Sequence, residues 1–418
     1  MSVPGGVLVV GASAAGLATV EALRRSGFAG AVTVVGAESH PPYDRPPLSK
    51  QVLSGAWEPE RARLRTREAL DALDAEFVLG DPALALDVPG RAVRTASGRT
   101  LRAGTVVVAT GTAPRTLPGQ TGLAGVHVLR TLDDAAALRA GLLESVSPVV
   151  VGDGVLGAEI AATARNMGLD ITLVGPGPAL MTPQLGGEVA TLLSALHTER
   201  GVRLRPGQAV RGLTGNGGRV DGVVLESGEK VPADLVVVAV GADPVTGWLQ
   251  DSGLRLERGL VCDAYCRAAD GVYGVGDVAR FHHQGLDALV RLENRTNAAE
   301  QAAAVAANIL GAAQPYTPVP YFWTDQFGTK IQVHGTLPAH ARMTVIDGDP
   351  TTGRFVARYT HNGRTTGLLG WNMPKQTRQH RQHLNDTLTN PTTNPTDAPP
   401  STPAPPSTPP SAPTPALS

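Results

Sequence analysis

The stretch VLVVGASAAG at residues 7–16 decides how the rest of the chain can be interpreted, and VVVGDGVLG at residues 149–157 repeats its pattern. Each begins with a short run of strand-forming residues, turns through tiny residues and continues into an alanine-rich stretch. A dinucleotide-binding turn needs this order, because glycines allow the tight turn and bring the backbone close to a pyrophosphate at a helix N-terminus. Two such turns predict two nucleotide sites, one for a cofactor that stays bound and one for a nucleotide that binds and dissociates.

The composition limits the functional classes. The 418 residues are enough for two or three domains, and the net charge of -1 argues against non-specific nucleic-acid binding. No apolar run approaches the roughly 18 residues that span a bilayer, and no signal peptide opens the chain. We therefore expect a cytoplasmic protein without membrane or nucleic-acid partners, a monomer or weak homodimer. The two cysteines, Cys262 and Cys266, are too few for a metal site and not spaced as a redox pair, so we expect no metal and interpret them as small strand residues.

Three features follow the first turn. A helix over residues 14–26 and a strand over 31–35 lead to Glu38, the candidate acceptor for ribose hydroxyls. The proline-rich loop at 41–50 is stiff and could place Arg45 and Lys50 against an anion or a flavin ring, or be a solvated loop. Arginine then alternates over residues 61–67, which indicates either a solvated face or a docking patch for an acidic partner.

The rest of the chain reads as a second nucleotide unit and a small third domain. The hydrophobic spacing predicts strands over 106–109, 171–174, 220–225 and 235–240, and an acidic residue at the tip of a strand over 271–277. It predicts helices from about 133, over 186–200 and over 296–310. Short alternating strands over 330–369 and a last helix indicate a β meander. From residue 385 the chain is almost entirely Pro, Thr, Ser and Ala, which predicts disorder.

These motifs together resemble the FAD-dependent, NAD(P)H-oxidising ferredoxin reductases of bacterial oxygenase systems, the putidaredoxin reductase and biphenyl dioxygenase reductase type. The resemblance covers about residues 7–384 and rests on GASAAG (11–16), PYDRPPLSK (42–50), ATG (109–111), GDGVLGAE (152–159), VGDV (275–278) and YFWTDQ (321–326).

The resemblance implies an α/β fold with two Rossmann-like nucleotide-binding domains of the glutathione-reductase type and a small C-terminal α+β domain. The implied boundaries are an FAD domain at 1–113 and 242–314, an NAD(P) domain at 114–241, a C-terminal domain at 315–384 and the tail at 385–418.

Site residues are carried over by position. The resemblance places Ala15 and Gly16 at the FAD pyrophosphate, Glu38 or the backbone of Ala37 at the adenosine ribose, Lys50 at the flavin, Arg130 at the phosphates, Asp277 at the ribityl chain and Glu159 near the nicotinamide. Lys50 and Glu159 are the expected catalytic residues. The remaining implied FAD contacts are Gly11, Ser13, Arg45, Ala83, Thr110, Gly111, Gly276, Arg295 and Trp323, and the remaining NAD(P) contacts are Gly152, Gly154, Leu156 and Gly157.

The chain departs from its relatives at two sites that matter here. Gly175 stands where NAD-using relatives usually carry an acidic residue, and no arginine follows closely, so we expect NADH to be used with weak discrimination against NADPH. Asn294-Arg295 replaces the His-Trp of many relatives, which affects packing beside the flavin. A long proline-rich tail is also foreign to them.

The resemblance implies that FAD takes a hydride from NAD(P)H. The pair of cysteines that flavin disulfide reductases carry is absent from residues 45–50, so electrons should leave singly to an external ferredoxin that serves an oxygenase. Two alternatives remain open: a flavin oxidase that uses O₂ or a small acceptor, and a flavin-binding protein with poor turnover.

Overall fold

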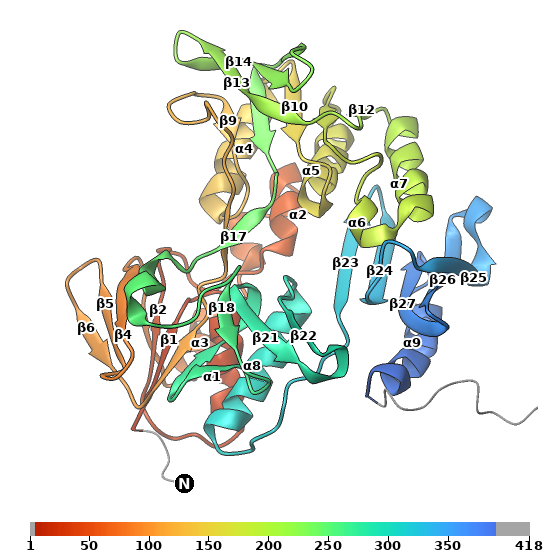
Figure 1. The fold of residues 1–418 in the computed structure, drawn as a ribbon. Coiled ribbons are helices and arrows are strands. Elements are labelled where there is room, and N and C mark those ends of the chain that lie inside the picture. Colours follow the sequence, from red (N-terminus) through yellow and green to blue (C-terminus); the bar gives the residue numbers. More distant parts are fainter. Residues whose placement is uncertain (1–4, 390–418) are drawn as a thin grey trace, which may run out of the picture.

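The computed structural model describes residues 5–389, which form two dinucleotide-binding domains and a β-rich C-terminal domain (Figure 1). In this part of the chain no helix is both long and apolar enough to cross a bilayer.

The first domain is built on a six-stranded sheet in the order β19-β20-β7-β1-β2-β3, parallel except where β19 meets β20. Its strands are β1 (Val7–Val10), β2 (Val32–Val35), β3 (Glu76–Val78), β7 (Thr105–Val108), β19 (Arg267–Ala269) and β20 (Val272–Gly274). All four residues of β1 and of β7 are buried, as a sheet covered on both faces requires. Helices α1 (Ala14–Arg25) and α8 (Arg295–Ile309) pack together beside this sheet (Figure 1).

Smaller elements complete this domain. They are the helices α2 (Gln51–Ser54) and α3 (Arg67–Asp71), the sheet of β4 (Ala83–Asp87), β5 (Ala92–Thr95) and β6 (Thr100–Arg102), and the sheet of β18 (Leu260–Cys262), β21 (Ala279–His283) and β22 (Ala288–Val290). Strands β20 and β7 pair although about 160 residues separate them, which shows that the second domain is inserted into the first.

The second domain repeats the same plan in the order β12-β11-β10-β16-β9, entirely parallel. Its strands are β9 (Val126–His127), β10 (Pro148–Val151), β11 (Thr172–Val174), β12 (Arg203–Arg205) and β16 (Leu235–Val238), and its helices are α4 (Leu132–Glu144), α5 (Val155–Asn166), α6 (Thr182–Leu185) and α7 (Gly187–Glu199). A meander of β13 (Val210–Asn216), β14 (Arg219–Leu225) and β15 (Lys230–Pro232) covers one side. The two connections between the domains run side by side, because β8 (Thr112–Pro114) pairs with β17 (Ala242–Pro244).

The C-terminal domain is an antiparallel sheet in the order β23-β24-β27-β26-β25 with α9 (Pro374–Thr389) against β27. Its strands are β23 (Tyr321–Gln326), β24 (Thr329–Gly335), β25 (Arg342–Asp349), β26 (Arg354–His361) and β27 (Arg364–Trp371). One hydrophobic cluster joins this sheet to both other domains, containing Leu48 from the first, Ile160 from the second and Phe355 from the third. One of the hydrophobic cores is therefore shared by residues of all three domains.

The sequence predictions of helices and strands hold throughout the nucleotide domains and the meander. Helix α9 continues to Thr389, past residue 384 at which the sequence ended the last domain. The rest of the predicted disordered tail, residues 390–418, lies outside the described residues. Cys262 lies in β18 as expected, whereas Cys266 occupies a turn with φ +62°.

Candidate functional site

The two glycine turns have nearly identical geometry. Gly11 (φ +125°) ends β1, and a Cβ added there would meet the Ala109 carbonyl oxygen at 2.1 Å; Gly152 (φ +122°) ends β10, with the Ala239 carbonyl oxygen at 2.2 Å. Both positions therefore require glycine, and each leaves a helix N-terminus pointing into the site.

Both turns open into a single cavity of about 1270 Å³. Its wall includes nearly every residue that the sequence assigned to either nucleotide, and it adds residues that the sequence did not single out. The additional polar residues are His40, Tyr43, Ser49, Thr112, Thr131, Asp134, Asp153, Gln184, Trp248, Arg291 and Glu293.

Three predicted contacts lie behind the wall and do not line the cavity: Gly16, Gly157 and Gly276. A Cβ on Gly16 would lie 1.8 Å from the Gly11 carbonyl oxygen, and one on Gly157 1.9 Å from that of Gly152. These two glycines let each helix pack closely under its turn. A Cβ added to Gly276 (φ +76°) would lie 2.9 Å from the methyl carbon of Ala15.

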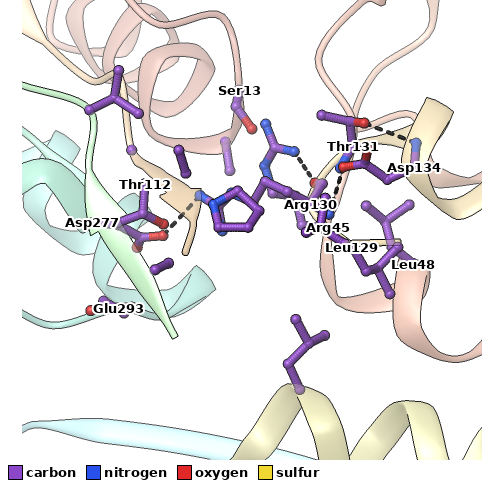
Figure 2. Close-up of a pocket in the computed structure, with 18 of the residues that line it drawn as sticks. Ser13, Arg45, Leu48, Thr112, Leu129, Arg130, Thr131, Asp134, Asp277 and Glu293 are labelled. Carbon is purple, nitrogen blue, oxygen red and sulfur yellow. Dashed lines mark hydrogen bonds and ion pairs between the residues drawn. The ribbon is translucent and has the colours of Figure 1, made fainter. Parts of the chain in front are cut away.

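Two arginine–acid pairs, Arg130 with Asp277 and Arg45 with Glu38, lie in the cavity wall. Arg130 donates to Asp277 across 3.3 Å, and the Arg45 guanidinium binds the Arg130 carbonyl oxygen (Figure 2). Burial and the nearby Arg45 cation both lower the pKa of Arg130. Each of the two arginines faces one acid across the cavity. An anion such as a diphosphate could bind both guanidinium groups and would relieve the repulsion between them.

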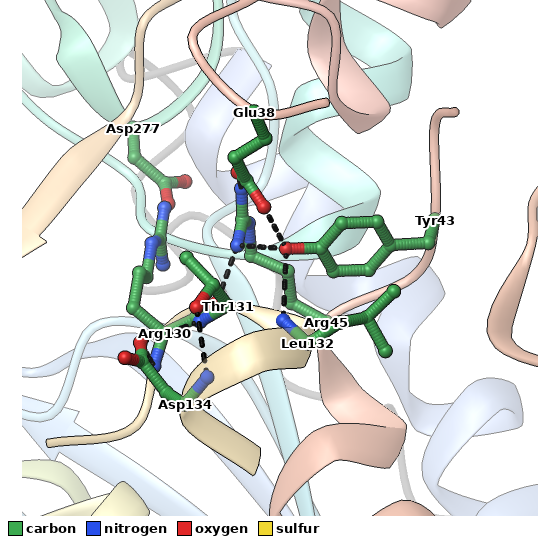
Figure 3. Close-up of polar contacts among 8 residues, drawn as sticks. All are labelled: Glu38, Tyr43, Arg45, Arg130, Thr131, Leu132, Asp134 and Asp277. Carbon is green, nitrogen blue, oxygen red and sulfur yellow. Dashed lines mark hydrogen bonds and ion pairs between the residues drawn. The ribbon is translucent and has the colours of Figure 1, made fainter. Parts of the chain in front are cut away.

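Glu38 comes from the loop after β2, as predicted, but its carboxylate is already occupied. One oxygen accepts from Arg45 at 2.7 Å and the other from the Tyr43 hydroxyl, which also accepts from the backbone N–H of Leu132 (Figure 3). This network ties the proline-rich loop to the N-terminus of α4. A ribose at Glu38 would have to share these oxygens, a competition that the sequence could not reveal.

A buried polar chain forms the other end of the site. Lys50 Nζ lies 2.5 Å from Glu159 Oε2, and the Ser49 hydroxyl donates to the same oxygen across 2.6 Å. The second carboxylate oxygen of Glu159 accepts from Thr324 at 2.7 Å. The Lys50 ammonium also lies 5.3 Å from the centre of the Trp323 ring, which is exposed at the cavity wall. Residues of all three domains therefore position Glu159.

Arg295, which stands where many relatives carry a tryptophan, forms an ion pair. Arg295, the first residue of α8, donates to Asp44 across 2.8 Å, while Asn294 caps the helix by accepting from the Asn297 backbone N–H. This departure therefore links α8 to the proline-rich loop and keeps Arg295 in the cavity wall.

The cavity fits FAD and a nicotinamide nucleotide by its own chemistry. Four buried polar atoms in residues of its wall have no partner among the described residues: Thr112 Oγ1, Arg130 Nε, Gln184 Oε1 and Trp248 Nε1. Such atoms are costly unless a ligand or water pairs with them. With two anion-binding helix N-termini and a large cleft, they match a bound dinucleotide.

Neither cysteine contributes to this site. Cys262 and Cys266 are buried outside the cavity wall, and burial raises the pKa of Cys266 to about 12. Both thiols are therefore unreactive, and no dithiol stands beside the flavin position.

Fold and site together define a two-nucleotide flavoprotein oxidoreductase. Residues 5–302 match the family model described as pyridine nucleotide-disulphide oxidoreductase, and residues 321–400 match the one described as reductase C-terminal. The chain belongs to the pyridine nucleotide-disulphide oxidoreductase family, and it is an NAD(P)H-dependent flavoprotein reductase that uses FAD.

Several relatives are similar over nearly their whole length. Rhodocoxin reductase of Rhodococcus erythropolis is 34% identical, over 88% of this chain and 87% of its own. A ferredoxin–NAD(P)⁺ reductase of Sphingomonas is 36% identical, over 87% of this chain and 88% of its own. The structure of a covalent putidaredoxin reductase–putidaredoxin complex superposes with a TM-score of 0.86 at 32% identity, covering 92% of this chain and 93% of that one.

Proposed function

We propose that this chain is a ferredoxin reductase that takes a hydride from NAD(P)H and passes electrons singly to an iron–sulfur ferredoxin serving an oxygenase. One observation carries the proposal: both nucleotide turns face the same cavity, and neither cysteine of the chain lies in its wall. A dithiol relay is thereby excluded, so the electrons must leave directly. The names of the relatives, which include a ferredoxin–NAD(P)⁺ reductase and a reductase in complex with putidaredoxin, support this proposal.

Bound FAD would supply an acceptor for the two electrons of a hydride from NAD(P)H and a donor of single electrons, so that one NAD(P)H could reduce two one-electron carriers. We propose that Arg45 and Arg130 hold its phosphates and that Asp277 accepts from a hydroxyl of its chain. Lys50 supplies a positive charge where negative charge develops on reduction. Glu159 holds that ammonium in place and faces the nicotinamide side of the cavity.

Two groups of basic residues could dock an acidic ferredoxin: the alternating arginines at 61–67 and the basic residues Lys375, Arg378 and Arg381 of α9. In the first group Arg65 pairs with Glu21 at 2.6 Å and Arg67 with Asp71 at 3.6 Å, whereas Arg61 and Arg63 are exposed and have no ion pair among the described residues. In the second group Lys375 and Arg378 are likewise exposed on α9 without an ion pair within the described residues. We propose that the unpaired cations of both groups are available for docking, and the test below addresses α9.

The test is a stopped-flow experiment in which the FAD-loaded protein is reduced with NADH or NADPH and then mixed with a candidate [2Fe–2S] ferredoxin. We expect rapid reduction by the nucleotide, slow reoxidation by O₂ and rapid reoxidation by ferredoxin. Ferredoxin reduction should slow with rising ionic strength, because exposed charges are screened beyond roughly 8–10 Å.

Arg378→Glu should raise the KM for ferredoxin without changing flavin reduction, and Arg65→Glu serves as the matched control at an already neutralised arginine. Rapid reoxidation by O₂ that ferredoxin does not accelerate would instead identify an oxidase. Negligible reduction by either nucleotide would identify a flavin-binding protein with poor turnover.

A further inference from the structure

The end of β11 is the position from which dinucleotide-binding folds usually present an acid to the adenosine ribose. Gly175 occupies it here, but the space beside Gly175 is filled. A Cβ added to Gly175 would lie 2.4 Å from Asp153 Oδ2 and 2.5 Å from Asp153 Cβ. The Cβ of Asp153 is held by the backbone of the glycine turn and cannot move away. Positions 153 and 175 therefore cannot both carry a side chain in this conformation. Asp153 therefore brings a carboxylate to the end of β11 from the neighbouring turn.

The loop after β11 holds this carboxylate in one orientation. The Gly177 N–H donates to Asp153 Oδ2 across 2.6 Å, and the Met181 N–H donates to the Asp153 carbonyl oxygen across 2.8 Å. No described residue donates to Asp153 Oδ1. Asp153 is half-buried and lines the large cavity together with Pro176, which follows Gly175. One carboxylate oxygen is thus held by the protein, and the other is available to a ligand.

The charge around this carboxylate is negative overall. A small hollow beside it is lined by only two ionisable residues, Asp153 and Arg205. The Arg205 guanidinium is engaged by Glu229, whose two oxygens lie 2.6 and 2.8 Å from the same nitrogen. The cation that could have attracted a phosphate is therefore neutralised, while the Asp153 charge has no cationic partner among the described residues.

We propose that Asp153 reads the adenosine ribose of the nicotinamide nucleotide in place of the missing acid at position 175, and that the chain therefore selects NADH over NADPH. This rests on the proposed function of the second nucleotide site. A carboxylate accepts from a ribose 2′-hydroxyl but repels a 2′-phosphate. The sequence prediction of weak discrimination considered Gly175 alone, and Asp153 replaces that expectation. NADH gains a charged hydrogen bond to Asp153, whereas NADPH meets charge repulsion there. Together the two effects correspond to a preference for NADH of at least about a hundredfold.

The test measures binding without turnover. The FAD-loaded protein is titrated calorimetrically with NAD⁺ and with NADP⁺, in the wild type and in Asp153→Asn. The amide keeps an oxygen that can accept from the Gly177 N–H, so unchanged FAD content and melting temperature would show that the loop is preserved. We expect the wild type to bind NAD⁺ at least about a hundredfold more tightly and Asp153→Asn to reduce the ratio to below about tenfold.

A double variant, Asp153→Gly with Gly175→Glu, moves the carboxylate to the position used by the usual fold and should restore the preference for NAD⁺. Gly175→Glu alone should weaken both nucleotides, because its side chain collides with Asp153. The proposal is overturned if the wild type binds both nucleotides within tenfold, if Asp153→Asn leaves the ratio unchanged, or if Arg205→Gln selectively weakens NADP⁺. In those cases the protein would still be reduced by a nicotinamide nucleotide, whereas failure to bind either would refute the proposed function as well.

Discussion

Substituting Thr324 by valine tests whether the C-terminal domain positions the carboxylate of Glu159, for which we propose a role beside the nicotinamide. Thr324 is 1% exposed on β23; its hydroxyl donates to Glu159 Oε1 across 2.7 Å and accepts from Gln326 Nε2 across 2.9 Å. Valine has nearly the same shape, so the change removes the hydroxyl without opening a cavity. Loss of a hydrogen bond to a charged group costs about 1.5–3 kcal/mol, and the partly unpaired Gln326 amide brings the total to about 2–4 kcal/mol.

The assay combines urea unfolding of the FAD-loaded protein with stopped-flow reduction by NADH. We expect Thr324→Val to lower the unfolding midpoint and also to slow flavin reduction, because Glu159 and the Lys50 ammonium bound to it lose their support from β23. Thr329→Val is the matched control: Thr329 is 8% exposed on the adjacent strand, and its hydroxyl has no side-chain hydrogen bond among the described residues.

Equal stability of Thr324→Val and Thr329→Val would refute the reasoning about the buried hydrogen bond. A destabilised Thr324→Val that is reduced by NADH at the wild-type rate would show that Thr324 supports only the fold and does not position Glu159.

Two further predictions concern the cofactor and acid stability. Asp277→Ala should weaken FAD binding about tenfold to a hundredfold, because a charged hydrogen bond is removed from the cavity; full occupancy after extensive dialysis would contradict this. Burial lowers the pKa of His197 and of His334 from 6.5 to about 4, so the unfolded chain binds more protons than the folded one between these values. Stability should therefore be complete above pH 6.5 and fall as the pH drops toward 4, with a loss of ~2 kcal/mol per histidine between pH 7 and 5. Urea midpoints at the two pH values measure this loss, which a His197→Gln/His334→Gln variant should largely abolish.

The sequence by itself determined the order of the domains and the positions of both nucleotide turns. These features are local: a β-branched run followed by glycines with positive φ, as at Gly11 and Gly152, has few alternatives to a strand, a turn and a helix. The stiff proline-rich loop and an acidic strand tip pointed to Lys50 and Asp277, and the resemblance to a known family pointed to Glu159. All three line the cavity in the folded chain.

Only the tertiary structure decided how these side chains are occupied. Glu38 has the expected place after β2, yet Arg45 and Tyr43 take its oxygens. The alternating arginines, which an extended segment would have put on one face, are spread over a 3-10 turn (Arg61), the loop that follows it (Arg63 and Arg65) and α3 (Arg67). Two of them, Arg65 and Arg67, pair with acids. Such contacts depend on how separate elements pack, which local periodicity does not encode.

The clearest case concerns the acidic residue that is absent from position 175. Gly175 lies more than twenty positions from Asp153, and no spacing rule connects them. Parallel pairing of β10 with β11 brings the two strand ends together, so the side chain of Asp153 fills the space that Gly175 leaves empty. Composition and motifs could show that an acid was absent from its usual position at the end of β11. Only the register of the sheet could show which carboxylate lies at that position instead, because proximity across strands is set by pairing and not by distance along the chain.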